Sequence, residues 1–204
     1  MKGKMFIFDF DGTIADTSGA VLDIAKRIAS ESGKGTITED DVEFFKENGA
    51  RAFLRRKKIS WLELPGMIAK GRKYFSEKKD IGVIDGIRSA LVDLKSKDCR
   101  LCVVSSNDKG NIISFLKENG MEGVFDEVLC ERGIFGKASI IRRLASEGGS
   151  VNMFYVGDEV RDGEAARKAG IPFIGVSWGF NSPKSLIGAG AVRIVRKPEE
   201  LDSI

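Results

Sequence analysis

The sequence contains no histidine, and this absence removes several classes of catalytic site. Without histidine there is no Ser-His-Asp triad, no Cys-His pair, no histidine-ligated zinc and no histidine general base. An enzyme of this composition must use carboxylates, lysine, hydroxyl groups or a hard metal ion for its chemistry.

Cysteine is also scarce, with three residues in the chain. A small, odd number argues against a disulfide framework and is typical of a reducing compartment. Cys99 and Cys102 have the C-x-x-C spacing of a redox pair, but Cys102 lies within the apolar run 101–104. A buried apolar role is therefore the better interpretation of Cys102.

Long apolar runs and a strong charge imbalance are missing as well. No run approaches the roughly 20 residues that span a membrane, and the few apolar residues after Lys2 and Lys4 are too short for a signal peptide. We therefore expect a cytoplasmic protein without a membrane partner.

With 33 basic and 30 acidic residues, the net charge of +3 does not indicate a nucleic-acid partner. A chain of 204 residues suits one domain, or one domain with a modest insertion.

Short apolar runs alternate with helical patterns over most of the chain. The runs that predict strands are 5–10, 101–105, 124–130, 151–156, 171–176 and 191–195. The patterns that predict helices between them are 86–97, 109–119, 137–147 and 160–169. Continuous apolar strands are covered on both faces, and strand–helix alternation is typical of parallel βαβ units. The sequence predicts an α/β fold with a doubly wound, Rossmann-like parallel sheet.

Residues 18–79 break this alternation, because they show helical patterns and no clear strand. We interpret them as a small α-helical cap that is inserted after the first strand. The core domain is then discontinuous and consists of residues 1–17 and 80–204.

Polar residues follow the predicted strands at their carboxyl ends. They are Asp9 and Asp11 after the first strand, Ser105, Ser106 and Asn107 after the second, Lys137 after the third, and Asp158 and Asp162 after the fourth. Ligands of doubly wound sheets bind beyond these ends, so we expect the eight residues to face one crevice.

The four carboxylates would repel one another without a cation to neutralise them. Asp9 and Asp11 are two residues apart, so on an extended strand they would point the same way. With no histidine and no suitable cysteine, oxygen ligands favour a hard cation, and Mg²⁺ is the first choice. Lys137, Ser105 and the helix start after Ser105 could hold an anion. Together they predict a site for phosphoryl transfer.

Four segments, FDFDGTIADT, VVSSN, FGKA and YVGDEVRD, resemble the four motifs of the haloacid dehalogenase (HAD) superfamily in order and spacing. The segments IRSALVDLKSKDCRLCVVSSN and GVSWGFNSP are also similar to its phosphoglycolate phosphatase-like branch. The resemblance covers nearly the whole predicted core. It is weak in the helical insertion, which corresponds in position to the cap of that branch.

The resemblance implies a role for each of these residues. Asp9 would attack phosphorus and form an aspartyl phosphate, while Asp11 would protonate the leaving alcohol and then activate water. Asp9, the backbone carbonyl of Asp11, and Asp158 would hold Mg²⁺, and Asp162 would support the metal shell through water or through Lys137. Dehalogenases lack the second acid because a halide needs no proton, so Asp11 favours phosphate esters.

The same resemblance implies that Ser105 and Lys137 grip the phosphoryl oxygens, with Ser106 and Asn107 beside them. Taken alone, Ser105 could instead be a helix N-cap and Lys137 a surface lysine. In the predicted cap, Arg51 is our candidate for binding a second anionic group of the substrate, chosen by its position. A solvated charged face is the alternative there.

The sequence therefore predicts a Mg²⁺-dependent phosphatase that hydrolyses small phosphorylated metabolites, as a monomer or homodimer. Two alternatives stay open. A phosphomutase or phosphotransferase would use the same residues but pass the phosphoryl group to a second alcohol. A non-catalytic module that binds phosphate or metal would have no need of Asp11 as an acid.

Overall fold

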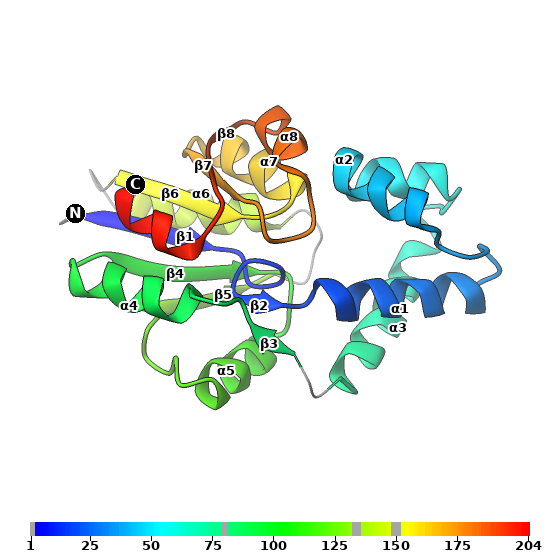
Figure 1. Ribbon diagram of the computed structural model, residues 1–204, viewed down its shortest axis with the longest axis horizontal. Coiled ribbons are helices and arrows are strands. Elements are labelled where there is room, and N and C mark those ends of the chain that lie inside the picture. The colour runs from blue at the N-terminus through cyan, green and yellow to red at the C-terminus, as the bar shows by residue number, and fades with distance from the viewer. Residues whose placement is uncertain (1–2, 79–80, 132–135, 148–151) are drawn as a thin grey trace.

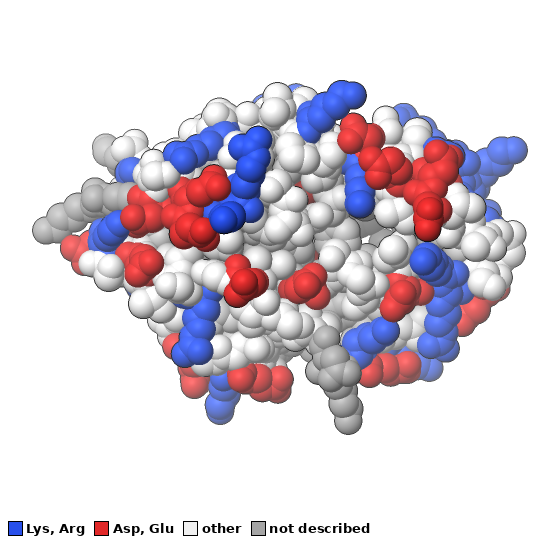
Figure 2. Space-filling view, in the orientation of Figure 1, with Lys and Arg blue, Asp and Glu red and all other residues white. Residues whose placement is uncertain are grey.

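A six-stranded parallel sheet with helices on both faces forms the larger part of the molecule, and three further helices extend from one end of it (Figure 1). The computed structural model describes residues 3–78, 81–131, 136–147 and 152–204. None of the helices in these ranges is long and apolar enough to cross a membrane. Acidic and basic side chains are interspersed over the face that Figure 2 shows.

The sheet has the strand order β5-β4-β1-β6-β7-β8. The strands are β1 (Lys4–Phe8), β4 (Arg100–Ser105), β5 (Glu127–Cys130), β6 (Asn152–Gly157), β7 (Phe173–Val176) and β8 (Ala191–Val195). From β1 the chain first builds outward through β4 and β5, and then returns to the other side of β1 with β6. The predicted doubly wound sheet is confirmed, and its topological switch point lies between β1 and β6.

Alternate residues of β1 belong to two separate apolar cores. Phe6 and Phe8 belong to the core on one face of the sheet, and Met5 and Ile7 to the core on the other. This arrangement explains why the strand is a continuous apolar run instead of an alternating one.

Each core is closed by its own helices. The first is covered by α4 (Ile87–Ser96), α5 (Lys109–Glu118) and the 3-10 helix η1 (Pro198–Ser203). The second is covered by α6 (Lys137–Glu147), α7 (Val160–Ala169) and α8 (Pro183–Gly188). The four predicted core helices are confirmed to within one residue at each end, whereas the short α8 and η1 were not predicted.

The first strand is shorter than predicted, because β1 ends at Phe8 and not at residue 10. The backbone N–H groups of Ile14 and Ala15 both donate to the Phe10 carbonyl, so the chain turns directly after the strand. The prediction that Asp9 and Asp11 share one face of an extended strand is therefore wrong. A tight turn sets the direction of each carboxylate separately.

The helical insertion consists of α1 (Ser18–Glu31), α2 (Glu39–Arg56) and α3 (Leu64–Ser76). At its base, β2 (Ala15–Asp16) and β3 (Gly82–Val83) pair as a short antiparallel ribbon. Strands of two residues leave no periodic pattern, so the sequence did not predict this ribbon. The predicted domain boundary between residues 79 and 80 falls outside the described residues.

The insertion is divided into two parts. Helices α1 and α3 pack on each other, whereas α2 packs against α7 and α8 of the core. Gly49 has a φ of 73° and kinks α2, and a side chain there would press on Val160. Asn181 of the core donates from Nδ2 to the carbonyls of Phe45 and Lys46, over 3.0 and 3.2 Å, just before this kink. Helix α2 is therefore held by the core.

Candidate active site

Asp9 begins the site, directly beyond the end of β1. Its backbone N–H donates to the Val156 carbonyl over 2.8 Å, which ties it to β6, and its Oδ1 accepts a 2.7 Å hydrogen bond from the Phe10 N–H. The residue is 1% exposed. The carboxylate is therefore fixed at the switch point of the sheet, where the crevice of a doubly wound fold lies.

Asp158 lies opposite, beyond the end of β6, and is fully buried. The Thr13 hydroxyl donates to its Oδ1 over 2.7 Å, and the Phe180 N–H donates to its Oδ2 over 2.8 Å. Gly12 has a φ of 75°, and a side chain there would clash with Asp158. A side chain at Gly179 would clash with Asp158 as well. Both glycines are needed so that two loops can close around this carboxylate.

Lys137, the first residue of α6, connects two acids of the site. Its Nζ lies 2.6 Å from Asp9 Oδ2 and 2.9 Å from Asp162 Oδ1, and all three side chains are buried. Burial alone would lower the lysine pKa, but Asp162 and Asp9 outweigh it and raise the pKa above its usual value. Lys137 therefore stays charged and is not the surface lysine of the alternative interpretation.

The carboxylates exceed the positive charge that is available to them. Burial raises the pKa of Asp9 to about 7, against the lowering effect of Lys137. Burial also raises the pKa of Asp158 well above its usual value, with Glu159 and Asp162 adding to the effect. A bound cation would remove this penalty, because it favours the ionised form of both acids.

The donor set fits a hard divalent cation. Oxygen atoms of Asp9, Asp158 and Asp162 lie within 4.8 Å of one another, and no thiol or imidazole accompanies them. Asp9 Oδ2 is buried and lies 2.6 Å from Lys137 Nζ, while Asp9 Oδ1 accepts from the Phe10 N–H. Asp162 is already engaged, since Oδ1 accepts from Lys137 and Oδ2 from the Glu159 N–H. The two oxygens of Asp158 accept from Thr13 and from the Phe180 N–H in the same way, and each carboxylate oxygen keeps a further lone pair. All three acids could therefore contribute ligands to the ion.

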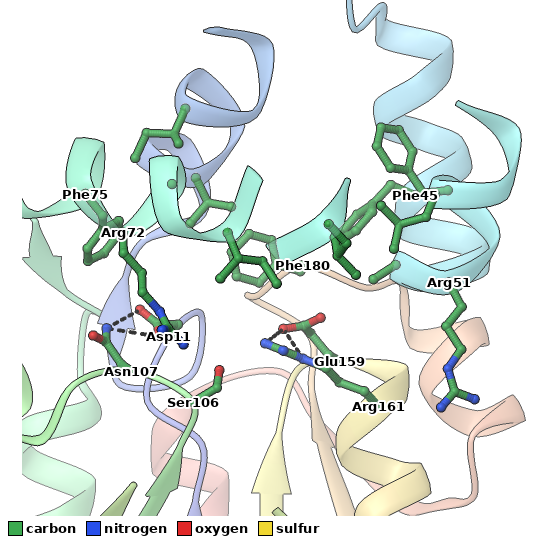
Figure 3. Close-up of a pocket in the computed structure, with 18 of the residues that line it drawn as sticks. Asp11, Phe45, Arg51, Arg72, Phe75, Ser106, Asn107, Glu159, Arg161 and Phe180 are labelled. Atoms are coloured by element: carbon green, nitrogen blue, oxygen red, sulfur yellow. Dashed lines mark hydrogen bonds and ion pairs between the residues drawn. The ribbon is translucent and has the colours of Figure 1, made fainter. Parts of the chain in front are cut away.

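Asp11 lies outside this group of three acids and lines a pocket instead. Asn107 Nδ2 lies 3.2 Å from Asp11 Oδ2 and 3.4 Å from Oδ1 (Figure 3). Burial raises the pKa of Asp11, and the Asn107 hydrogen bond offsets only part of the shift. A carboxyl group with a raised pKa can act as a general acid near neutral pH.

The residues after β4 form the wall beside Asp11. Ser105 is fully buried, and its Oγ accepts a 3.0 Å hydrogen bond from the Asn107 N–H. Ser106 and Asn107 line the pocket. The N-cap of α5 is Asp108, which accepts from the Gly110 N–H, so the N-cap alternative for Ser105 does not hold.

Arg51 is separated from the other predicted residues. It lines the pocket, but its Nη1 lies 3.5 Å from Glu164 Oε2, and in Figure 3 it points away from Asp11. Arg72 of α3, which the sequence analysis did not select, extends toward Asp11 in the same view. The missed signal is its place on an apolar stripe: Arg72 follows Leu64 and Ile68 at four-residue spacing.

Arg161 is a second basic residue to which the sequence analysis gave no role. It lines the pocket, and its Nε donates to Glu159 Oε1 over 2.9 Å (Figure 3). Burial would lower its pKa, but Glu159, Asp9 and Asp162 raise it further above its usual value. Its charge is thus shared between Glu159 and the buried acids.

The chain is similar to known proteins over most of its length. Residues 6–176 match the family model described as haloacid dehalogenase-like hydrolase. The chain belongs to this family. It is 31% identical to a phosphoglycolate phosphatase of Synechococcus elongatus, over 97% of this chain and 95% of the relative. It is 30% identical to a phosphorylated carbohydrates phosphatase of Thermotoga maritima, over 96% and 94% of the two chains.

Solved structures agree with the fold of this haloacid dehalogenase-like hydrolase. A protein described as a predicted phosphatase from Clostridium acetobutylicum superposes with a TM-score of 0.82. The two chains are 25% identical, and the match covers 100% of this chain and 98% of the other. The family that the four motifs predicted is therefore confirmed, and the chain is a hydrolase by family.

Proposed function

We propose that the protein is a Mg²⁺-dependent phosphatase that releases phosphate from small phosphorylated metabolites. The observation that carries the proposal is the buried group of Asp9, Asp158, Asp162 and Lys137, with Asp11 held beside it by Asn107. A buried nucleophile, a separate acid of raised pKa and an excess of oxygen ligands are the parts that phosphoryl transfer needs. The relatives that act on phosphoglycolate and phosphorylated carbohydrates support the substrate class.

In the first step, the Asp9 carboxylate attacks phosphorus and the bond from phosphorus to the alcohol oxygen breaks. Asp11 gives its proton to that oxygen as the alcohol leaves. An aspartyl phosphate then remains on Asp9. Lys137 favours the ionised form of Asp9 and aligns it, and together with Ser105 it would contact the phosphoryl oxygens.

In the second step, Asp11 acts as a base because it has lost its proton. It takes a proton from water, the water oxygen attacks phosphorus, and the bond to Asp9 breaks. Phosphate leaves, Asp9 is a carboxylate again, and Asp11 again carries a proton. Mg²⁺ bound by Asp9, the Asp11 carbonyl and Asp158 would neutralise the charge that builds up on the phosphoryl oxygens.

The test is the release of free phosphate from p-nitrophenyl phosphate and a panel of phosphorylated metabolites, with Mg²⁺ and with a chelator. We expect release that needs Mg²⁺ and falls by about 10⁴-fold or more in Asp9→Asn. Release that persists in the chelator or in Asp9→Asn would contradict the mechanism.

The same panel addresses the two alternatives. A phosphomutase or phosphotransferase would move organic phosphate to a second alcohol with little free phosphate. A binding module would bind Mg²⁺ but turn over none of the esters. Either result would replace the phosphatase proposal.

A further inference from the structure

The pocket beside Asp11 is larger than a phosphoryl group requires. Its volume is about 480 Å³, which is within the range of roughly 300–1,000 Å³ for sites that hold whole organic ligands. It lies between the two parts of the insertion, with α1 and α3 on one side and α2 on the other (Figure 3). The space is therefore large enough for the part of the substrate that leaves with the alcohol oxygen.

Apolar side chains form both facing walls of this pocket. Those on the side of α1 and α3 are Val21, Ile24, Leu64, Ile68 and Phe75, and those on the side of α2 are Phe45, Phe53 and Leu54. Phe180, from the loop that closes on Asp158, lies at the junction with the core. In a folded helical insertion such faces normally pack on one another, and here they enclose a space.

Polar groups are gathered at the core end of the pocket, where Asp11, Ser106 and Asn107 lie. The arginines that line the pocket are directed toward acidic groups and not into its apolar part. Arg161 is paired with Glu159 and Arg51 with Glu164, while Arg72 extends toward Asp11. A carboxylate or second phosphate among the apolar walls would lose its hydration without a partner.

We infer that the preferred substrate is a phosphate monoester whose alcohol carries an extended apolar group, alkyl or aryl, which lies between α2 and the α1–α3 pair. This inference rests on the proposed phosphatase function and narrows its substrate class. A small acidic ester such as 2-phosphoglycolate would leave most of the apolar surface in contact with water.

The inference is tested with ethyl, butyl and hexyl phosphate, whose leaving alcohols are almost equally basic, so the chemical step stays constant. Each methylene that the walls bury should raise kcat/KM by up to about fourfold, equivalent to about 0.8 kcal/mol. We expect hexyl phosphate to exceed both ethyl phosphate and 2-phosphoglycolate by at least about tenfold. Equal kcat/KM values across the series, or preference for 2-phosphoglycolate, would overturn the inference.

Two leucines that are close in sequence provide a matched pair of variants. Leu64 lines the pocket, whereas Leu62 is 94% exposed and does not. In Leu64→Ala the ratio of kcat/KM for hexyl over ethyl phosphate should fall by at least about threefold, since part of the apolar wall is lost. In Leu62→Ala the ratio should stay unchanged. An unchanged ratio in Leu64→Ala, with its unfolding temperature close to that of the wild type, contradicts the inference.

Ile68→Val gives a second readout with a smaller disturbance, because it removes one methylene from the same wall. The ratio of kcat/KM for hexyl over ethyl phosphate should fall by up to about fourfold.

The ester series separates this inference from the proposed function. Mg²⁺- and Asp9-dependent release that is equal for all chain lengths would overturn this inference but would still support the phosphatase function. Absence of release from every ester would remove the proposed function and the inference together.

Discussion

The two ends of the pocket are built in different ways. At the core end, the chain leaves a buried strand and a turn or helix start holds each side chain, so Asp9, Asp158 and Lys137 have fixed partners within 3 Å. At the other end, the walls are apolar faces of α1, α2 and α3, whose side chains line the space and are held by packing, as between Phe45 and Phe53, instead of by hydrogen bonds. The chemistry is thus preorganised by the sheet, while the shape of the substrate site depends on how two halves of an insertion are placed.

The largest effect that separates the two ends should come from Asp11→Asn. We expect it to lower kcat/KM for alkyl phosphates by about 10²–10⁴-fold, because an alkoxide needs a proton to leave. For p-nitrophenyl phosphate the loss should be much smaller, since p-nitrophenolate leaves without one. Initial rates of alcohol or p-nitrophenolate release at ester concentrations well below KM measure this difference in kcat/KM, which reports only the steps up to departure of the leaving group and excludes the later step in which Asp11 acts as a base. Equal losses for both would show that Asp11 does not act as the acid.

The next effect is on stability at the core end. Lys137→Met leaves the buried acids Asp9 and Asp162 without their cation, so the free energy of unfolding should fall by about 3–5 kcal/mol. Urea unfolding in the presence of chelator measures it. The control is Lys95→Met, which removes a half-exposed ion pair with Asp126 and should cost at most about 1 kcal/mol. Similar losses in both variants would refute a special role for the buried lysine.

A pH dependence should follow from the same buried acids. The pKa of Asp9 is about 7 in the folded protein, against 3.8 for an unperturbed aspartate. Between these two pH values the Asp9 carboxyl group is therefore mostly ionised in the unfolded chain and mostly protonated in the folded protein. Without metal, this contribution to stability is complete below about pH 4 and is lost as the pH rises to about 7. Asp158 acts in the same direction.

Mg²⁺ should reverse this loss, because it binds the ionised carboxylates. The stabilisation on adding Mg²⁺ should therefore be larger near pH 8 than near pH 5, by on the order of a few kcal/mol in the free energy of unfolding. It should appear as a larger rise in unfolding temperature near pH 8. Thermal unfolding with Mg²⁺ and with chelator at each pH isolates the effect from other titrating groups. A rise in unfolding temperature that is larger near pH 5 would contradict the binding of Mg²⁺ by the ionised carboxylates of Asp9 and Asp158.

The smallest effect compares two arginines of the insertion. Arg72→Ala should lower kcat/KM by about tenfold, because a charged donor that extends toward Asp11 is lost. Arg51→Ala should change it by no more than about twofold, since Arg51 forms an ion pair with Glu164 and points away from Asp11. A larger effect for Arg51 would favour the residue that was selected from sequence position.

The core could be predicted from sequence because its signals are local. An apolar run that ends in acidic residues, such as the run before Asp9, predicts both the strand and the polar site at the end of that strand. The direction of Asp11 could not be predicted in this way, because the turn at Gly12 has to fit against Asp158, which is 146 residues away in the chain. The same is true of Gly179, whose small size is needed only because that carboxylate lies against it.

The insertion was predicted as helices but not as two separate parts. Periodicity shows that α2 has an apolar face, but it cannot say whether that face meets another cap helix or encloses a space. Arg72 was overlooked for the same reason, since its value depends on where α3 lies relative to Asp11. Arg51, which was chosen by position, stays a prediction.

Asn181 joins the two regions with one side chain. Its backbone N–H donates to the Asp158 carbonyl, its Oδ1 accepts from the Val160 N–H, and its Nδ2 reaches the two carbonyls before the kink of α2. Helix α2 is thus anchored to the core beside the acids, whereas α1 and α3 are connected to the core at the β2–β3 ribbon. Sequence changes in α1 and α3 can therefore alter the shape of the pocket while Asn181, and the carboxylates next to it, keep their positions.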